Sequence, residues 1–293
     1  MTSAGPDTVA AMGGPVVVVT DSTAYLPAGV AEQYGVRVVP LQVVLGGRSG
    51  AEGSEVTPTD VATALADWVP VSTSRPTPAE FAAVYRSALS AGAAGVVSLH
   101  LSRELSGTWD SARLAADEVG SDAVRVVDSR SAAMGLGFAV LSAAEAAAAG
   151  GSLEDAYAAA VSTAERTTTL FCVDTLEHLR RGGRIGAAQA LLGTALSVKP
   201  ILHVLEGRIV PLEKVRTASK GVARLEALAV AAAGSGPVDV AVHHLAAPRR
   251  AALLTERLRA RLPRLRQLHS SEIGAVVGAH VGPGVLGVVV VRS

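Results

Sequence analysis

Four turns of the sequence carry side chains that could bind or activate a small molecule. Each follows a predicted strand and is rich in hydroxyls or glycine, and His280 stands just before the last one. They are Asp21-Ser22-Thr23, Thr73-Ser74, Ser106-Gly107-Thr108 and Gly282-Pro283-Gly284. Hydroxyls and free backbone N–H groups at the end of a strand are donors that suit an anion. The set predicts an anion-binding site, although each turn by itself is equally typical of a simple helix cap.

The clearest of these turns connects a buried strand to a helix. Residues 95–99 are apolar, and a helical stretch runs from Ser106 to about Val119. We expect Ser106 to cap this helix and Gly107 to let a ligand approach the backbone closely. Ligands of open α/β sheets bind beyond the carboxyl ends of the strands, so the first three turns should meet at one edge of the first domain. The turn after His280 would close the site from a second domain.

The sequence lacks the motifs of the enzyme classes that act at such turns. Ser106 is not in a Gly-x-Ser-x-Gly elbow, and Asp21 is followed two residues later by Thr23 rather than by a second acid. There is no Gly-x-x-x-x-Gly-Lys-Ser/Thr loop, and no Gly-x-Gly-x-x-Gly loop follows the first strand. The candidate groups left at these turns are hydroxyls, backbone amides and one imidazole. A set of this kind binds an anion without transforming it. The alternative is a hydrolase or phosphotransferase that uses Ser106 or Asp21 with His280.

Composition narrows the class of protein. A chain of 293 residues favours two domains, and with 49% hydrophobic but only 3% aromatic residues its core must consist mainly of Ala, Val and Leu. Lys and Arg together number 26, as do Asp and Glu, so no nucleic-acid partner is expected. No apolar run reaches the ~18 residues needed to span a bilayer, so no stable membrane insertion is expected either. The single Cys172 excludes a disulfide framework and a cysteine-rich zinc site, and we expect no metal. Residues 1–13 predict a flexible tail rather than a signal peptide, which indicates a cytoplasmic protein.

Hydrophobic patterning predicts two kinds of architecture along the chain. Apolar runs alternate with helical stretches over residues 14–165, which predicts an N-terminal doubly wound α/β domain with a mostly parallel sheet. A small loop or hairpin insertion is expected around residues 45–72. Over residues 166–293 a hairpin about Gly207, two helices and a closing strand predict a C-terminal α+β domain. The ligand is expected in the cleft between these domains.

Eight short motifs resemble those of the DegV family, and they occur in one order over roughly residues 15–291. Most are weak signals singly, and it is their shared order that makes the resemblance specific. The motifs are Val19-Thr20-Asp21-Ser22-Thr23 with Leu26-Pro27, Thr73-Ser74-Arg75-Pro76-Thr77, the run Leu105–Ala112, Val127-Asp128-Ser129, the run Leu176–Ile185, Val198-Lys199-Pro200-Ile201, Glu206-Gly207 with Lys214-Val215-Arg216, and the run Gly278–Gly284.

The resemblance implies two α/β-type domains with a long-chain fatty acid held between them. It implies no catalysis and no cofactor: the protein presents the acyl carboxylate to a separate fatty-acid kinase. Carried over to this sequence, the carboxylate-binding residues are Thr73, Ser74, Ser106, Gly107, Thr108 and His280. Supporting or partner-facing positions are Asp21, Ser22, Arg75, Arg184, Gly282 and Gly284, and Arg184 is a candidate for the kinase-facing surface or for an acyl phosphate.

Two residues depart from the family pattern, which usually has Gln at the position of Arg75 and Tyr at that of Trp109.

Elementary energetics agree with a lipid ligand, because burial of about 15 methylenes at ~0.8 kcal/mol each gives roughly 12 kcal/mol before costs. A carrier for another apolar acid or lipid, with no kinase partner, is a third interpretation.

Overall fold

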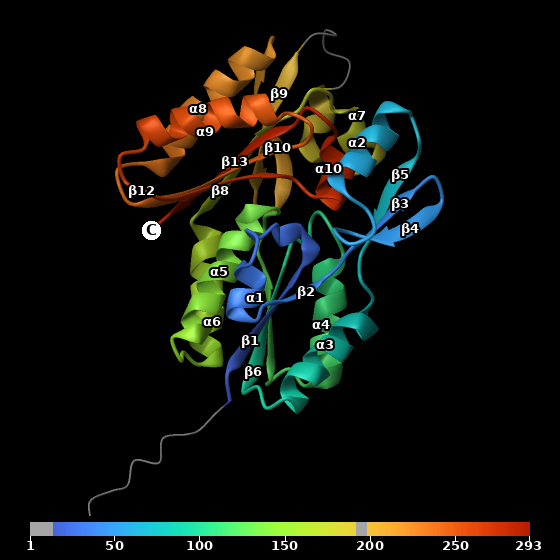
Figure 1. Cartoon of the computed structure of the whole chain (residues 1–293), viewed down its shortest axis with the longest axis vertical. Helices are drawn as coiled ribbons and strands as arrows, with labels where there is room; N and C mark the ends of the chain where they lie inside the picture. The colour runs from blue at the N-terminus through green and yellow to red at the C-terminus, as the bar shows by residue number, and fades with distance from the viewer. Residues whose placement is uncertain (1–13, 192–197) are drawn as a thin grey trace, which may run out of the picture.

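The computed structural model describes residues 14–191 and 198–293, so the predicted tail at residues 1–13 lies outside the described residues. Figure 1 shows two halves stacked along the long axis of the molecule, with a small third sheet beside them. Among the helices in these described ranges, none combines the length and apolarity needed to cross a bilayer.

The first half is built on a parallel sheet with the strand order β2-β1-β6-β7. Its strands are β1 (Val16–Asp21), β2 (Arg37–Val39), β6 (Gly95–His100) and β7 (Val124–Asp128). Helices cover both faces (Figure 1): α3 (Pro78–Ser90) and α4 (Thr108–Val119) on one, and α1 (Val30–Tyr34), α5 (Met134–Ala148) and α6 (Leu153–Glu165) on the other. Strands buried on both faces explain the continuous valine runs. The predicted doubly wound parallel sheet is confirmed.

The segment between β2 and β6 forms a separate antiparallel sheet with the order β4-β3-β5. Its elements are β3 (Gln42–Leu45), β4 (Arg48–Ala51), β5 (Val71–Ser74) and the helix α2 (Pro58–Ala66). Thr73 and Ser74 thus end a strand of this small sheet, paired with β3. Because β5 pairs with β3 and not with the parallel sheet, this turn is positioned by the small sheet.

The second half contains a six-stranded mixed sheet in the order β10-β9-β8-β13-β11-β12. Its strands are β8 (Thr167–Cys172), β9 (Lys199–Leu205), β10 (Arg208–Val215), β11 (Val238–His244), β12 (Leu265–Glu272) and β13 (Leu286–Arg292). The predicted hairpin about Gly207 is β9–β10. Helices α8 (Ala218–Ala233) and α9 (Pro248–Arg261) cover one face, which confirms the α+β class.

Four short helical elements complete the fold of the described residues. They are the 3-10 turns η1 (Ser22–Ala24) and η2 (Gly186–Leu191) and the helices α7 (Glu177–Arg181) and α10 (Ala275–Val281). The other face of the six-stranded sheet, which α8 and α9 do not cover, packs on α5. There Val289 and Val291 contact Met134 and Phe138. Through this packing, the polar turns of the first half lie opposite the second half.

One buried carboxylate ties three parts of the fold together. Glu52, 8% exposed, accepts hydrogen bonds from the Ser22 hydroxyl, from the Tyr25 hydroxyl at 3.1 Å and from the Val276 N–H at 2.7 Å. These donors belong to η1, to the residue after it and to α10, whereas Glu52 belongs to the small-sheet segment. Burial raises the pKa of Glu52, although its three donors oppose that shift.

We predict that Glu52→Ala lowers the free energy of unfolding by about 2–4 kcal/mol, because three buried donors lose their acceptor. Chemical denaturation measures the effect. Glu32→Ala is the matched control, since Glu32 is exposed on α1. A loss for Glu52→Ala as small as that of the control would contradict this role.

A buried histidine joins the second sheet to the first half. His243 Nε2 accepts the Met134 N–H at the start of α5 over 3.3 Å, and its Nδ1 lies 3.1 Å from Ser271 Oγ. Burial lowers the pKa of His243 to about 4, so the imidazole is neutral near pH 7.

We predict that stability falls as the pH decreases from about 6.5 towards 4. The unfolded chain takes up this proton near pH 6.5 but the folded chain only near pH 4, so acid favours unfolding. The loss from this residue between about pH 7 and pH 5 is about 2 kcal/mol. Denaturation at several pH values should give a shallower slope for His243→Gln than for the wild type, and equal slopes would contradict the assignment.

Candidate functional site

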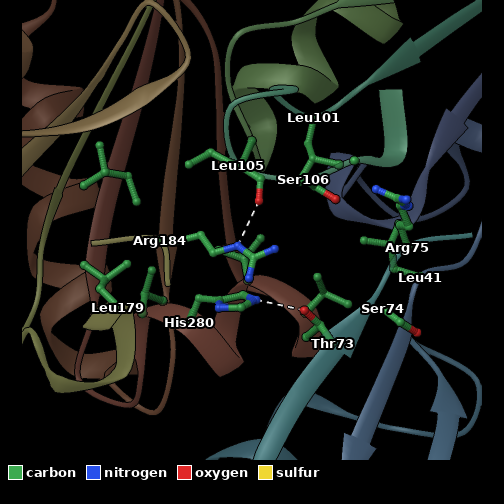
Figure 2. Close-up of a pocket in the computed structure, with 16 residues that line it drawn as sticks. Leu41, Thr73, Ser74, Arg75, Leu101, Leu105, Ser106, Leu179, Arg184 and His280 are labelled. Atoms are coloured by element: carbon green, nitrogen blue, oxygen red, sulfur yellow. Dashed lines mark hydrogen bonds between the residues drawn. The ribbon is translucent and has the colours of Figure 1, made fainter. Parts of the chain in front are cut away.

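A cavity of about 310 Å³ opens where the two halves and the small sheet meet. The side chains that Figure 2 labels include the polar and charged residues of its lining, and we call the part of the cavity that they line the mouth. They are Thr73, Ser74, Arg75, Ser106, Arg184 and His280. The remaining lining is apolar and includes Leu41, Leu101, Leu105 and Leu179. Four of the six predicted carboxylate-binding positions, Thr73, Ser74, Ser106 and His280, therefore line one cavity, and Gly107 lines it as well.

His280 faces the mouth from the end of α10. Its Nε2 lies 2.8 Å from Thr73 Oγ1, which joins residues 207 positions apart in sequence (Figure 2). Its Nδ1 is buried, and no partner for it exists within the described part of the chain. Burial, and secondarily Arg184, lower the pKa of His280 to about 4. The site therefore contains a neutral imidazole near pH 7.

The turn after α7 is shaped to receive this imidazole. A Cβ on Gly182 would lie 2.1 Å from His280 Nδ1, so any larger residue there would displace the ring. Two positions later, Arg184 reaches across the cavity. Its Nε donates to the Leu105 carbonyl at 2.9 Å and its Nη1 to the Gly182 carbonyl at 2.5 Å. The guanidinium is held by backbone oxygens and has no carboxylate against it in the described structure.

Ser106 does not cap α4, contrary to expectation. Gly107 is the N-cap residue, and Ser106 Oγ lies 2.9 Å from Thr108 Oγ1 and accepts the Thr108 N–H over 3.3 Å. The helix begins one residue later than a serine cap would require, which leaves the Ser106 side chain at the cavity. Thr108 is fully buried and does not line the cavity, so it orients Ser106 from behind.

Arg75 adds a second guanidinium to the mouth. Its Nη1 lies only 1.7 Å from where a Cβ on Gly107 would be, so the glycine makes room for it. Figure 2 shows the Arg75 guanidinium and the Ser106 hydroxyl turned toward each other. Across residues 14–191 and 198–293 no hydrogen bond or ion pair engages Arg75, and no acidic side chain lines the cavity. Two guanidiniums without a carboxylate make the mouth attractive to an anion.

Asp21 and Ser22 support the cavity wall without lining it. Asp21 is fully buried, and its Oδ2 accepts the Leu101 N–H at 3.0 Å and lies 3.0 Å from His100 Nδ1. The Ser22 hydroxyl accepts the Leu41 N–H at 3.0 Å. Both side chains accept backbone N–H groups of residues that line the cavity, so they do not point into the cavity themselves.

Gly282 and Gly284 also lie outside the cavity lining. Both have positive φ, +76° and +86°, and turn the chain from α10 into β13. A Cβ on Gly282 would lie 2.1 Å from the His178 ring, and one on Gly284 would lie 2.2 Å from Asp174 Oδ2. Their role in the structure is to let neighbouring side chains pack against the turn.

A second, deeper cavity of about 80 Å³ continues the first. Five lining residues are common to both, namely Leu105, Ala132, Ile209, Val277 and Val281. Its only polar side chains are Thr169 and His243. Thr169 Oγ1 lies 2.9 Å from Ser131 Oγ, and both nitrogens of His243 are engaged as described above. The site as a whole is polar at its mouth and apolar at its end.

Residues of the deeper cavity were not identified from the sequence, because apolar lining residues have the same pattern as core residues. Within the described ranges, no group of His, Cys, Asp and Glu side chains is placed to hold a metal ion. The arrangement as observed can bind an amphiphile with an anionic head group.

Comparison with known proteins identifies relatives along nearly the whole chain. The family model described as "Uncharacterised protein, DegV family" matches residues 15–293. A DegV domain-containing protein of Streptomyces coelicolor is 59% identical over 275 residues, which are 94% of this chain and 98% of the relative.

Solved structures agree with this relationship. A DegV family protein from Thermus thermophilus, described as fatty acid binding, is 38% identical with a TM-score of 0.91 and covers 95% of this chain and 100% of its own. DegV of Bacillus subtilis, described as a fatty acid binding protein, is 36% identical with a TM-score of 0.86 and covers 96% of this chain and 100% of its own. The protein therefore belongs to the DegV family.

Proposed function

We propose that the protein binds a long-chain fatty acid, with the carboxylate at the polar mouth and the acyl tail running along the apolar lining of the larger cavity into the deeper one. The observation that carries the proposal is the continuity of the two cavities, which are polar at one end and, apart from Thr169 and His243, lined by apolar residues at the other. The descriptions of the Thermus and Bacillus relatives as fatty acid binding support it. We also propose that residues 14–165 and 166–293 form two domains with this site between them.

The carboxylate is held by neutral donors and by nearby positive charge. The hydroxyls of Thr73, Ser74 and Ser106 and the Gly107 backbone N–H are its donors, with Arg75 and Arg184 beside them. When His280 Nε2 donates to Thr73 Oγ1, the Thr73 hydroxyl proton is free to point at the ligand. Thr108 contributes by fixing Ser106 rather than by contact.

This protein catalyses no reaction itself under the proposal. A hydrolase would need a nucleophile hydrogen-bonded to a base, and that base oriented by an acid. Here Ser106 is paired with Thr108, His280 with Thr73, and Asp21 with His100. None of these pairs joins Ser106 or Asp21 to His280, and no acid in the described structure orients His280 through its Nδ1, so the geometry favours binding over the Ser106 or Asp21 enzyme.

We further propose that the bound carboxylate is presented to a separate fatty-acid kinase. The mouth carries the exposed Arg75 and Ser74, so a partner can approach the head group while the tail stays buried. Arg184 lies where it can stabilise the charge of an acyl phosphate. A carrier for another apolar acid, without a kinase, is the competing interpretation.

Mass spectrometry of the purified protein tests binding directly. Native spectra should show a mass excess of one fatty acid, which organic extraction releases as the free acid. Protein that carries no lipid and takes up no added long-chain acid would overturn the proposal.

We predict that Ser106→Ala weakens fatty-acid retention by about 1–3 kcal/mol, because the carboxylate loses one of its hydrogen-bond donors. Competition with a fluorescent fatty acid measures the change in affinity. Ser90→Ala, at the exposed end of α3, is the matched control and should bind as the wild type does. Unchanged retention by Ser106→Ala would remove Ser106 from the site.

The presentation step has its own test. Protein loaded with a fatty acid and incubated with a bacterial fatty-acid kinase and ATP labelled on the γ-phosphate should yield labelled acyl phosphate. The reaction with protein stripped of lipid is the control. Binding without any labelled product, across the kinases tried, would favour the simple carrier.

A further inference from the structure

The strand β13 contains a glycine that its own packing does not require. The sequence of β13 is Leu286, Gly287 and then four valines to Val291, followed by Arg292, and all but Arg292 are buried. Gly287 has no positive φ, so its backbone conformation is open to any residue. Glycine inside a strand weakens it, which makes an unforced glycine in a central strand a feature that needs a reason.

The surroundings of Gly287 leave room for a side chain. A Cβ there would lie 3.6 Å from the Leu170 carbonyl oxygen, 3.7 Å from Phe171 Cβ and 3.8 Å from His243 Cβ, all of which are ordinary contacts. In the sheet, Gly287 stands opposite Phe171 on one neighbouring strand and His243 on the other. The missing side chain therefore leaves a notch between Phe171 and His243.

This notch is part of the deeper cavity. Gly287, Phe171 and His243 all line it, together with Val289 on the same strand. It lies on the sheet face that packs towards α5, opposite the face covered by α8 and α9. The position is thus at the end of the site remote from Thr73 and Ser106, neither of which lines the deeper cavity.

We propose that Gly287 sets the depth of this cavity and thereby the length of acyl chain that the protein accepts. The inference rests on the proposed function and adds to it a preference for acyl chains of a certain length. Since the polar groups at this end, Thr169 and His243, already have partners, the chain end that fits is plain hydrocarbon, without a hydroxyl or second carboxyl group.

The test compares Gly287→Ala with two other variants of the full chain. Gly236→Ala is the matched control, because a Cβ on Gly236 meets no atom within 4 Å. Val289→Ala changes the cavity in the opposite direction by removing two methyl groups from its wall. Each protein is offered an equimolar series of straight-chain saturated acids of about 12 to 20 carbons, and native mass spectrometry reports the occupancy of each acid.

Gly287→Ala should shift the preferred acid to a shorter chain, with affinity falling about fourfold for each methylene that no longer fits. Val289→Ala should shift it to a longer chain, and Gly236→Ala should match the wild type. A length profile of Gly287→Ala identical to the control, or a loss equal at all lengths, would overturn the inference. Failure of the wild type to take up any acid would instead overturn the proposed function.

Discussion

The geometry of the site depends on how α10 is held, because this helix cannot cap itself. It is seven residues long, and its N-cap residue, Gly274, offers no side chain. The Val276 N–H donates to Glu52 and the Val277 N–H to the Tyr25 hydroxyl at 3.2 Å. A Cβ on Gly274 would lie 2.2 Å from the Tyr25 ring, so the glycine lets the tyrosine reach the helix. Residues far away in sequence thus fix the helix that carries His280.

Much of the framework follows from local sequence. The valine runs predict strands buried on both faces, and three helices of the first half begin with a Ser or Thr cap and an acid three residues later, at Thr57, Thr77 and Ser152. By contrast, α10 was not expected. Its cap is supplied by Glu52, 224 positions away, so the signal lies in tertiary structure and not in its own residues.

The same reason decides which of the candidate polar side chains line the cavity. Residue type alone singled out Thr73, Ser106 and His280, and long-range packing brings these three to the cavity. Asp21 is of an equally suitable type, but the Leu101 N–H and His100 take its Oδ2 and the Thr23 N–H takes its Oδ1, so it supports the wall without lining it. Whether a polar side chain after a strand faces a ligand or a backbone amide depends on the partners that other segments supply. Apolar residues that line the cavity, such as Val289, have the same sequence pattern as residues of the core and so could not be identified from the sequence.

The polarity of the two cavities also determines how an amphiphile must lie. With the tail inward, each buried methylene contributes about 0.8 kcal/mol, and the head group needs only orientation. With the carboxylate inward, the charge would enter a space where Thr169 and His243 already have partners, at a cost of several kcal/mol. The mouth instead offers hydroxyl groups and the guanidiniums of Arg75 and Arg184. No acidic side chain is among the described residues that line it, so these positive charges are available to an anion. A single orientation is therefore favoured without a buried salt bridge, which keeps the head group at the surface where another molecule can reach it.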